Sequence, residues 1–473
     1  MGLAALAGAL LLAPPLPAGT ISFRNEVMAV LSRSGCNQGA CHGNQNGKGG
    51  FKLSLRGEDP AWDFAALTRD GLGRRTDRLR PADSLILRKP TATIPHEGGR
   101  RFSVGSPEYQ LLYRWIAAGL PADPPSAPVL RRLEVTPTEQ VLVEPADRVR
   151  LRVRAFFSDG TERDVTGLAV FEVSNQVATV SPAGEVRREQ AGEAAVLVRY
   201  LDRQAVARLA FVPARPGYAW RPVPEANYID HFVFAKLPSL RVRPSELCSD
   251  SVFLRRAYLD TLGILPTADE ARAFLADARP DKRARLIDAL LQRPEFAEFW
   301  ALKWCDLLRA EEKVLDVKGV RVLHEWLRRC IAEGKPLNEL ARDLLAAQGS
   351  TYADPPANFY RALRDPQERA EAVAEVFLGI RLKCARCHNH PFDRWTQNDY
   401  HGLAAFFARV QYRIVANRRR DKFDKHEFDG EQVVWMERSG EVSHPRTGAV
   451  LRPLFPGQPT PELAPDADRL LLL

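Results

Sequence analysis

Long apolar runs and methionines are scarce in this chain of 473 residues. Beyond the N-terminus, no segment approaches the 18 consecutive apolar residues of a membrane-spanning helix, so no transmembrane anchor is expected. Only three methionines are present. No serine–histidine–aspartate arrangement, paired carboxylates or nucleic-acid-binding module can be singled out either. The sequence therefore indicates no particular hydrolytic chemistry and no nucleic-acid partner.

The bulk composition is that of a globular protein with several domains. Hydrophobic residues make up 45% and charged residues 27% of the chain, and the length suits two to four domains. The formal net charge of +8 comes mainly from arginine. These arginines favour either solvated helix faces or a docking face for an acidic partner. The short clusters are Arg74-Arg75, Arg100-Arg101, Arg131-Arg132 and 418–420.

The best-defined signal is a CxxCH motif formed by Cys384, Cys387 and His388. Two thiols at this spacing can bind the two vinyl groups of one porphyrin, and the histidine that follows can bind the iron as axial ligand. A zinc site that adds His390, a disulfide, or plain packing are the alternatives. For the opposite axial position we favour His401, and the remaining candidates are His426, His444 and Met436. His390 lies only two residues beyond His388, and the alternative for it is to stack on a second haem or to bridge the domains.

A second motif, CxxxxCH, is formed by Cys36, Cys41 and His42. The spacing is a rarer haem-attachment pattern, and a small disulfide loop is its alternative in an oxidising compartment. Residues 43–121 contain no methionine and a single histidine, His96, on a loop before a helix that is predicted to begin at Ser106. The distal ligand of small cytochromes has this position, so we predict ligation by His42 and His96. The alternative for His96 is an ordinary histidine on a surface loop. Two imidazoles generally give a lower potential than methionine with histidine.

The N-terminal half divides into three predicted segments. Residues 1–19 combine a short apolar run with small and helix-breaking residues, as in a secretory signal peptide. Residues 20–122 form a compact, mostly α-helical unit around the CxxxxCH motif. In residues 129–213, apolar and polar residues alternate and turn signals recur, which predicts a β-sandwich.

The C-terminal half is predicted to be mainly helical. Helix caps and amphipathic patterns recur over residues 224–410, with a capping box at 267–270 and a helix from Gln367 to Ile380 that leads into the CxxCH motif. This domain ends just after the motif. Residues 411–473 are basic and irregular, with weak strand signals. The fold class is therefore multidomain, with a small α domain, a β-sandwich and a mainly α-helical domain.

Several stretches resemble known families. NQVATV at 175–180 is similar to the group 2 bacterial immunoglobulin-like (Ig-like) domain. The runs at 227–230, 255–263, 384–395 and 399–407 resemble the large secreted planctomycete proteins that combine a cytochrome c-like domain with domains of unknown function. The resemblance implies haem binding at both cysteine motifs but no established reaction. Because such proteins generally continue further, it also implies that 411–473 is the start of a truncated C-terminal domain.

Position 401 is usually aromatic in these proteins, which weakens His401 as a general axial ligand.

The leading hypothesis is an exported c-type cytochrome, periplasmic, secreted or at the cell surface. It would hold one or two covalently attached haems and transfer electrons to an unidentified redox partner protein. One alternative is a haem-dependent or carbohydrate-related enzyme in the helical domain. Another is a cell-surface binding protein that contacts carbohydrate or a cell surface through the Ig-like domain.

Overall fold

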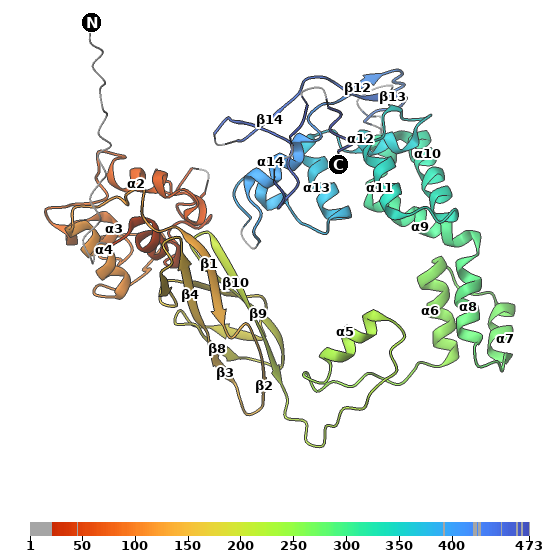
Figure 1. Ribbon diagram of the computed structural model, residues 1–473, viewed down its shortest axis with the longest axis horizontal. Coiled ribbons are helices and arrows are strands. Elements are labelled where there is room, and N and C mark those ends of the chain that lie inside the picture. Colours follow the sequence, from red (N-terminus) through yellow and green to blue (C-terminus); the bar gives the residue numbers. More distant parts are fainter. Residues whose placement is uncertain are drawn as a thin grey trace, which may run out of the picture. The chain divides into compact units, whose positions relative to one another are not determined.

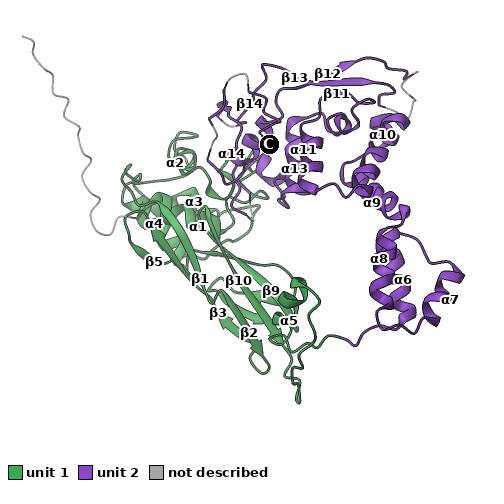
Figure 2. Cartoon of the chain, turned by 45° about the vertical axis from the view of Figure 1, so that its right-hand side comes forward, with its two compact units in different colours: residues 1–244 green, residues 245–473 purple. Residues whose placement is uncertain are grey.

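The computed structural model describes residues 21–44, 46–390, 393–419, 423, 427–445, 447–459, 462–464 and 467–472. The chain divides into two compact units, residues 1–244 and residues 245–473 (Figure 2). The molecule is thus a multidomain protein with both β sheets and helices. The predicted signal peptide, residues 1–19, and the candidate ligand His426 lie outside the described residues. Within the described parts, no helix has the length and apolar character needed to cross a bilayer.

The first unit begins with a small helical region that forms its own apolar core. Its longest helix, α4 (Pro107–Ala117), starts as predicted: the Ser106 hydroxyl accepts a hydrogen bond from the amide of Tyr109 (3.3 Å). Phe23 and Trp115 pack against each other at the centre of this core, with ring centroids 5.3 Å apart. The other elements are η1 (Phe23–Val27), α1 (Met28–Arg33), η2 (Leu55–Gly57), α2 (Pro60–Thr68), η3 (Pro81–Asp83) and α3 (Leu85–Arg88).

A β domain with three sheets follows in the same unit (Figure 1). The sheet orders are β1-β4-β5, β2-β10-β9-β6 and β3-β8-β7, and all pairs are antiparallel except β2 with β10. Leu151 and Val153 are fully buried, whereas Arg150, Arg152 and Arg154, which alternate with them, are exposed, so the predicted alternation is confirmed. The strands are β1 (Leu130–Thr136), β2 (Glu139–Val143), β3 (Arg148–Arg150), β4 (Arg152–Phe157), β5 (Glu162–Asp164), β6 (Val170–Val173), β7 (Ala178–Val180), β8 (Glu185–Arg188), β9 (Gly192–Tyr200) and β10 (Arg203–Val212).

The β domain packs directly against the segment that leads to the first cysteine motif. Ala29 of α1 belongs to the apolar core of the β domain. The Tyr200 hydroxyl donates to the carbonyl of Asn25 (2.6 Å), and the Asn25 side chain donates to the carbonyl of Pro128 (2.9 Å). Arg33 donates to the carbonyl of Ala169 (3.3 Å). These contacts fix α1, and with it the start of the cysteine loop, on the β domain.

The second unit is mainly helical, as predicted. Its cap at Thr267 confirms the expected capping box: the Thr267 hydroxyl accepts from the amide of Glu270 (3.3 Å), and the Glu270 carboxylate accepts from the amide of Thr267 (2.7 Å). Its helices are α6 (Asp250–Leu262), α7 (Ala268–Ala276), α8 (Lys282–Leu291), α9 (Pro294–Leu307), α10 (Glu312–Ala332), α11 (Leu337–Leu345), η4 (Pro355–Ala357), α12 (Asn358–Ala362), α13 (Pro366–Phe377), η5 (Lys383–Arg386) and α14 (Gln397–Ala405). A short helix assigned to the first unit, α5 (Tyr228–Lys236), has no buried residue.

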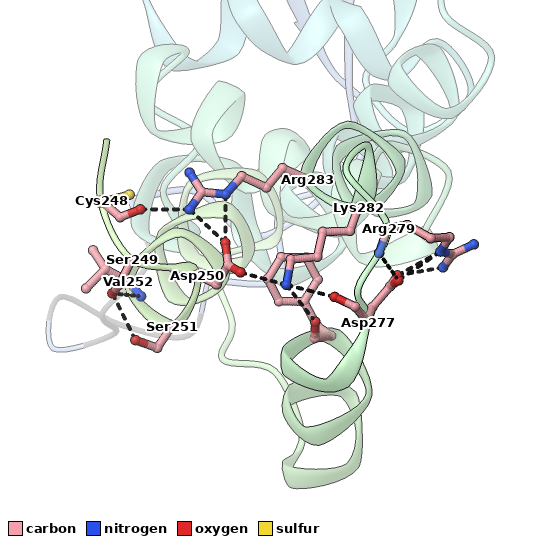
Figure 3. A network of polar contacts seen from close by, with 10 residues as sticks. Cys248, Ser249, Asp250, Ser251, Val252, Asp277, Arg279, Lys282 and Arg283 are labelled. Atoms are coloured by element: carbon pink, nitrogen blue, oxygen red, sulfur yellow. Dashed lines mark hydrogen bonds and ion pairs between the residues drawn. The ribbon is translucent and has the colours of Figure 1, made fainter. Parts of the chain in front are cut away.

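Charge pairs join the N-terminal ends of α6 and α8. Asp250 lies between two cations: its carboxylate accepts from Arg283 (2.9 Å) and pairs with Lys282 (2.6 Å) (Figure 3). Arg283 also donates to the carbonyl of Cys248, and Lys282 to the carbonyl of Asp277 (2.7 and 2.9 Å). Hydrogen bonds from Lys282 and then Arg283 lower the pKa of Asp250. This network holds the first three helices of the unit in place.

The residues after α14 pack into the same core as the helices. Val434, Val442 and Leu470 are buried among helical residues. Residues 411–472 thus share the core of the helical domain as far as the structure describes them. The strands of the second unit are β11 (Gly349–Ser350), which precedes α14, and β12 (Val410–Ile414), β13 (Gln432–Met436), β14 (Val442–Ser443) and β15 (Val450–Leu451), which follow it, with sheet orders β11-β13-β12 and β14-β15.

Candidate functional site

The residues predicted around the first motif meet at one cavity. Cys36, Cys41, His42 and His96 all line a cavity of about 250 Å³ in the N-terminal helical region. This volume is slightly below the range that is typical of small-molecule sites, roughly 300–1,000 Å³. His96 is far from the motif in sequence, so the fold itself brings these four residues together.

A series of tight turns after α1 places the two cysteines. The amide of Cys36 donates to the carbonyl of Leu31 (2.9 Å), and the amide of His42 donates to the carbonyl of Cys36 (3.0 Å). Gly43 is required here, because a Cβ at this position would lie 2.1 Å from the carbonyl oxygen of Asn37. The loop is therefore closed on itself without a disulfide.

Both cysteines of this loop are free thiols in different environments. Cys36 is buried, and burial raises the pKa of its thiol to about 12. Cys41 is half-buried, and Arg101 donates a hydrogen bond to its sulfur (3.3 Å). Two thiols that open onto one cavity meet the first requirement for thioether attachment of a porphyrin.

His42 is held in one tautomer by its neighbours. Its Nδ1 lies 2.9 Å from the carbonyl oxygen of Phe51 and 3.1 Å from that of Lys48, so Nδ1 bears the proton and donates. Nε2 is then the atom with the free lone pair. Burial is the main cause that lowers the pKa of His42, which keeps the ring neutral. A neutral imidazole with Nδ1 bonded to a carbonyl is the usual state of a metal-bound histidine.

His96 shows the same arrangement on the loop before α4. Its Nδ1 lies 2.8 Å from the carbonyl oxygen of Gly99, which again leaves Nε2 as the acceptor. Gly98 gives the ring its space, because a Cβ at that position would lie 3.0 Å from Cε1 of His96. His42 and His96 are close enough for their charges to interact. Two thiols and two imidazoles in this state fit a haem.

Sequence reasoning missed the basic side chains of the cavity wall. Arg74, Arg75 and Arg101 come from two of the noted arginine clusters, which we interpreted as solvated or docking faces. Instead, Arg75 is buried and stacks on Phe51, with its guanidinium carbon 4.4 Å from the ring centroid. The only available signal was that Arg101 follows His96 closely in the sequence, and no such signal exists for Arg74 and Arg75.

The second motif has a different setting. Cys384 lies on η5 and Cys387 follows it; both are exposed and free. His388 is half-buried, and its Nδ1 lies 2.7 Å from the carbonyl oxygen of Asn389. The zinc alternative requires these residues and His390 to converge, and no group of three or more such ligands comes together in the described part of the chain.

His401 packs against this second motif from α14. It is buried, and its Nε2 lies 3.1 Å from the carbonyl oxygen of Arg386, within the motif. Its Nδ1 has no hydrogen-bond partner among the described residues, and its ring centroid lies 6.2 Å from that of His444. Burial lowers the pKa of His401. Because the nitrogen nearest the motif is bonded to the backbone, axial ligation by His401 stays a prediction.

Taken together, the chain joins a small helical domain with a thiol- and imidazole-lined cavity to a β domain and a mainly helical unit. Residues 228–412 match the family model PSCyt2, described as a protein of unknown function (DUF1549). The matched region runs from α5 into β12 and includes the CxxCH motif, close to the predicted limits 224–410. No curated protein matches the chain.

Proposed function

We propose that the protein is an exported c-type cytochrome that holds haem covalently at the first motif and transfers single electrons. One observation supports this most: His42 and His96 line the same cavity as two free thiols, and the Nδ1 of each lies at a backbone carbonyl. When bound, haem supplies one-electron redox chemistry.

The two cysteines and two histidines of the cavity then have defined roles. Cys36 and Cys41 attach the porphyrin through their sulfurs, and His42 and His96 offer Nε2 to the iron. The carbonyl of Phe51 maintains the tautomer of His42 and increases its basicity as a ligand. Two such imidazoles favour a low reduction potential.

A second haem at Cys384, Cys387 and His388 is part of the proposal, with less support from the geometry. The exposed thiols are accessible for attachment. Nε2 of His388 is available, because its Nδ1 is bonded to Asn389. Ligation by His401 through Nε2 would require it to release the carbonyl of Arg386.

The remaining parts of the proposal concern the β domain and the location. The likeness at residues 175–180 supports an Ig-like domain that positions the first haem, because Tyr200 and Ala29 join the β domain to the helical region. Covalent haem attachment takes place outside the bacterial cytoplasm, so we propose a periplasmic, secreted or cell-surface protein. An acceptor or donor protein completes the function, without nucleic acid.

The test is a pyridine haemochrome count on protein from a host with the c-type maturation machinery. Wild type is expected to contain two haems per chain, and the variants Cys36→Ala/Cys41→Ala and Cys384→Ala/Cys387→Ala one each. Loss of haem only in the first variant would restrict the proposal to the first motif. A wild type without haem would refute it.

A further inference from the structure

The cavity wall has an excess of positive charge. Five basic side chains line it, and the only carboxylate in the wall belongs to Glu97. A wall of this kind favours a ligand that brings negative charge. The basic residues are Lys48, Arg74, Arg75, Lys89 and Arg101.

Three of these cations already have partners within the protein. Lys48 pairs with Glu97 (3.0 Å). Arg75 donates to the carbonyls of Ala66, Asp70 and Gly50, so its guanidinium is part of the domain core. The third, Arg101, donates to the sulfur of Cys41 (3.3 Å).

Arg74 and Lys89 retain donors that the protein does not use. The guanidinium of Arg74 is exposed and forms no hydrogen bond or ion pair with any described residue. Lys89 donates one hydrogen bond, to the carbonyl of Pro95 (2.9 Å), and an ammonium has three N–H groups. Arg74 precedes η3 and Lys89 ends α3, so two separate segments each place one cation at the cavity.

We propose that Arg74 and Lys89 bind the two propionate carboxylates of the haem, which makes the cavity selective for a dianionic porphyrin. The inference rests on the function proposed above. A guanidinium can bind a carboxylate through two parallel hydrogen bonds, whereas an ammonium acts as a compact charge. Since both side chains are exposed, the carboxylates remain in contact with water, and their desolvation costs little.

The test compares ferric haem with its dimethyl ester, which has the same ring but no carboxylate charge. The protein is the full chain with Cys36→Ala, Cys41→Ala and His388→Ala, made without the maturation machinery, so that binding is non-covalent and confined to the first motif. Absorbance titration gives the two dissociation constants. Ferric haem should bind at least about ten-fold more tightly than the ester, as expected for two charge-assisted contacts.

When Arg74→Gln and Lys89→Gln are added to this same triple variant, the dissociation constant of the ester should exceed that of ferric haem by only about three-fold or less. The matched control Arg78→Gln/Arg100→Gln removes two exposed arginines outside the cavity wall and should leave the preference unchanged. Equal affinities for haem and its ester in the protein that retains Arg74 and Lys89 would overturn the inference. This comparison does not depend on whether the Arg74→Gln/Lys89→Gln variant folds.

Failure of the inference is distinguishable from failure of the proposed function. If matured wild type contains covalent haem but the ester binds as well as haem, only the propionate assignment is wrong. If neither compound binds and matured wild type also lacks haem, both are wrong. If neither compound binds but matured wild type contains haem, the predicted selectivity is absent and the inference alone falls.

Discussion

The ammonium of Lys48 lies 3.0 Å from a carboxylate oxygen of Glu97. This ion pair joins the loop that supplies the carbonyl acceptor of His42 to the loop that bears His96. The two histidine-bearing loops are thereby connected beside the cavity. Lys48 lowers the pKa of Glu97 through a hydrogen bond and its charge. The ion pair is therefore fully formed above the ordinary pKa range of a glutamate, and it is lost as the pH falls through the lowered pKa of Glu97.

Glu97→Gln should loosen the His96 loop and let an external ligand replace that histidine more readily. We expect carbon monoxide to bind the ferrous holoprotein a few-fold faster, because an exposed ion pair contributes modestly. The wild-type rate should rise with salt, whereas the rate of the variant should depend little on salt. The control Asp83→Asn removes an exposed carboxylate outside the cavity wall and should behave as wild type. Identical rates of carbon monoxide binding in wild type, Glu97→Gln and Asp83→Asn would show that the ion pair does not hold the His96 loop.

Gly98→Ala should disturb the distal histidine without strain in the backbone. The new Cβ would lie 3.0 Å from Cε1 and 3.3 Å from Nε2 of His96, so the ring must move by a few tenths of an ångström. We expect a partly high-spin ferric absorption spectrum in place of a low-spin one. Gly39→Ala is the matched control, since its Cβ meets only Leu55 at 3.8 Å. An unchanged low-spin spectrum in Gly98→Ala would argue against His96 as the ligand.

Asp63 makes the stability of the cavity region dependent on pH. Its carboxyl is buried, its two oxygens lie 2.6 Å from the amide and the hydroxyl of Ser54, and burial raises its pKa to about 7. For an acid with a raised pKa, folding favours the protonated form. Stability is thus highest below the unfolded pKa, near 4, and falls as the pH rises to about 7.

Asp63→Asn should abolish this dependence and stabilise the region above pH 7 by on the order of 3 kcal/mol. The amide can replace both hydrogen bonds of the protonated acid. Opening free energies of α2 amides, from native-state hydrogen exchange at pH 4.5 and 8, would measure the effect. Asp70→Asn, an exposed position in the same region, is the control. If the opening free energy of the α2 amides fell equally between pH 4.5 and 8 in wild type and in Asp63→Asn, the pH dependence would not come from Asp63.

In the helical unit, Asp316 and Arg361 form a buried ion pair (3.1 Å). Asp316 has φ 55° and ψ 172°, a backbone conformation that favours glycine. Burial alone would raise the pKa of Asp316, but hydrogen bonds from the amide of Gly319, from Tyr352 and from the amide of Gly430 lower it. The stability that this pair contributes is present above the ordinary aspartate pKa and is lost as the pH falls through the lowered value.

Arg361→Met should destabilise the helical unit by about 3–5 kcal/mol, because it leaves a buried carboxylate unpaired. Asp316→Gly and Asp316→Ala both remove the carboxylate, but glycine accommodates the backbone. We therefore expect the glycine variant to be about 1 kcal/mol more stable than the alanine variant. Thermal unfolding followed by circular dichroism gives the order. Equal melting temperatures for the glycine and alanine variants would show that the backbone strain is absent.

The sequence predicted those features of the fold that depend only on residues a few positions apart. The caps at Ser106 and Thr267 and the alternation at Leu151 and Val153 are short-range patterns, and the structure confirms all three. The predicted helix that precedes the CxxCH motif ends at Phe377, three residues before the expected Ile380. Element ends depend on tertiary contacts and are the least predictable part of such patterns.

Sequence reasoning predicted four residues that meet at the cavity, but it did not predict their surroundings. Residue type and spacing identified the cysteines and His96. The carbonyl of Phe51 and the side chain of Arg101 reach the cavity only through tertiary packing, and no pattern in the sequence encodes such contacts. The direct packing of Ala29 on the β domain was also beyond sequence reasoning, which treated that domain as a separate unit.

Covalent haem attachment at the first motif is tested by mass spectrometry of the peptide that contains Cys36, Cys41 and His42, after proteolysis of wild-type protein from a cytochrome-maturing host. We expect one peptide heavier by the mass of a haem, with neither cysteine open to alkylation. Recovery of the unmodified peptide, with both thiols alkylated or joined as a disulfide, would contradict it.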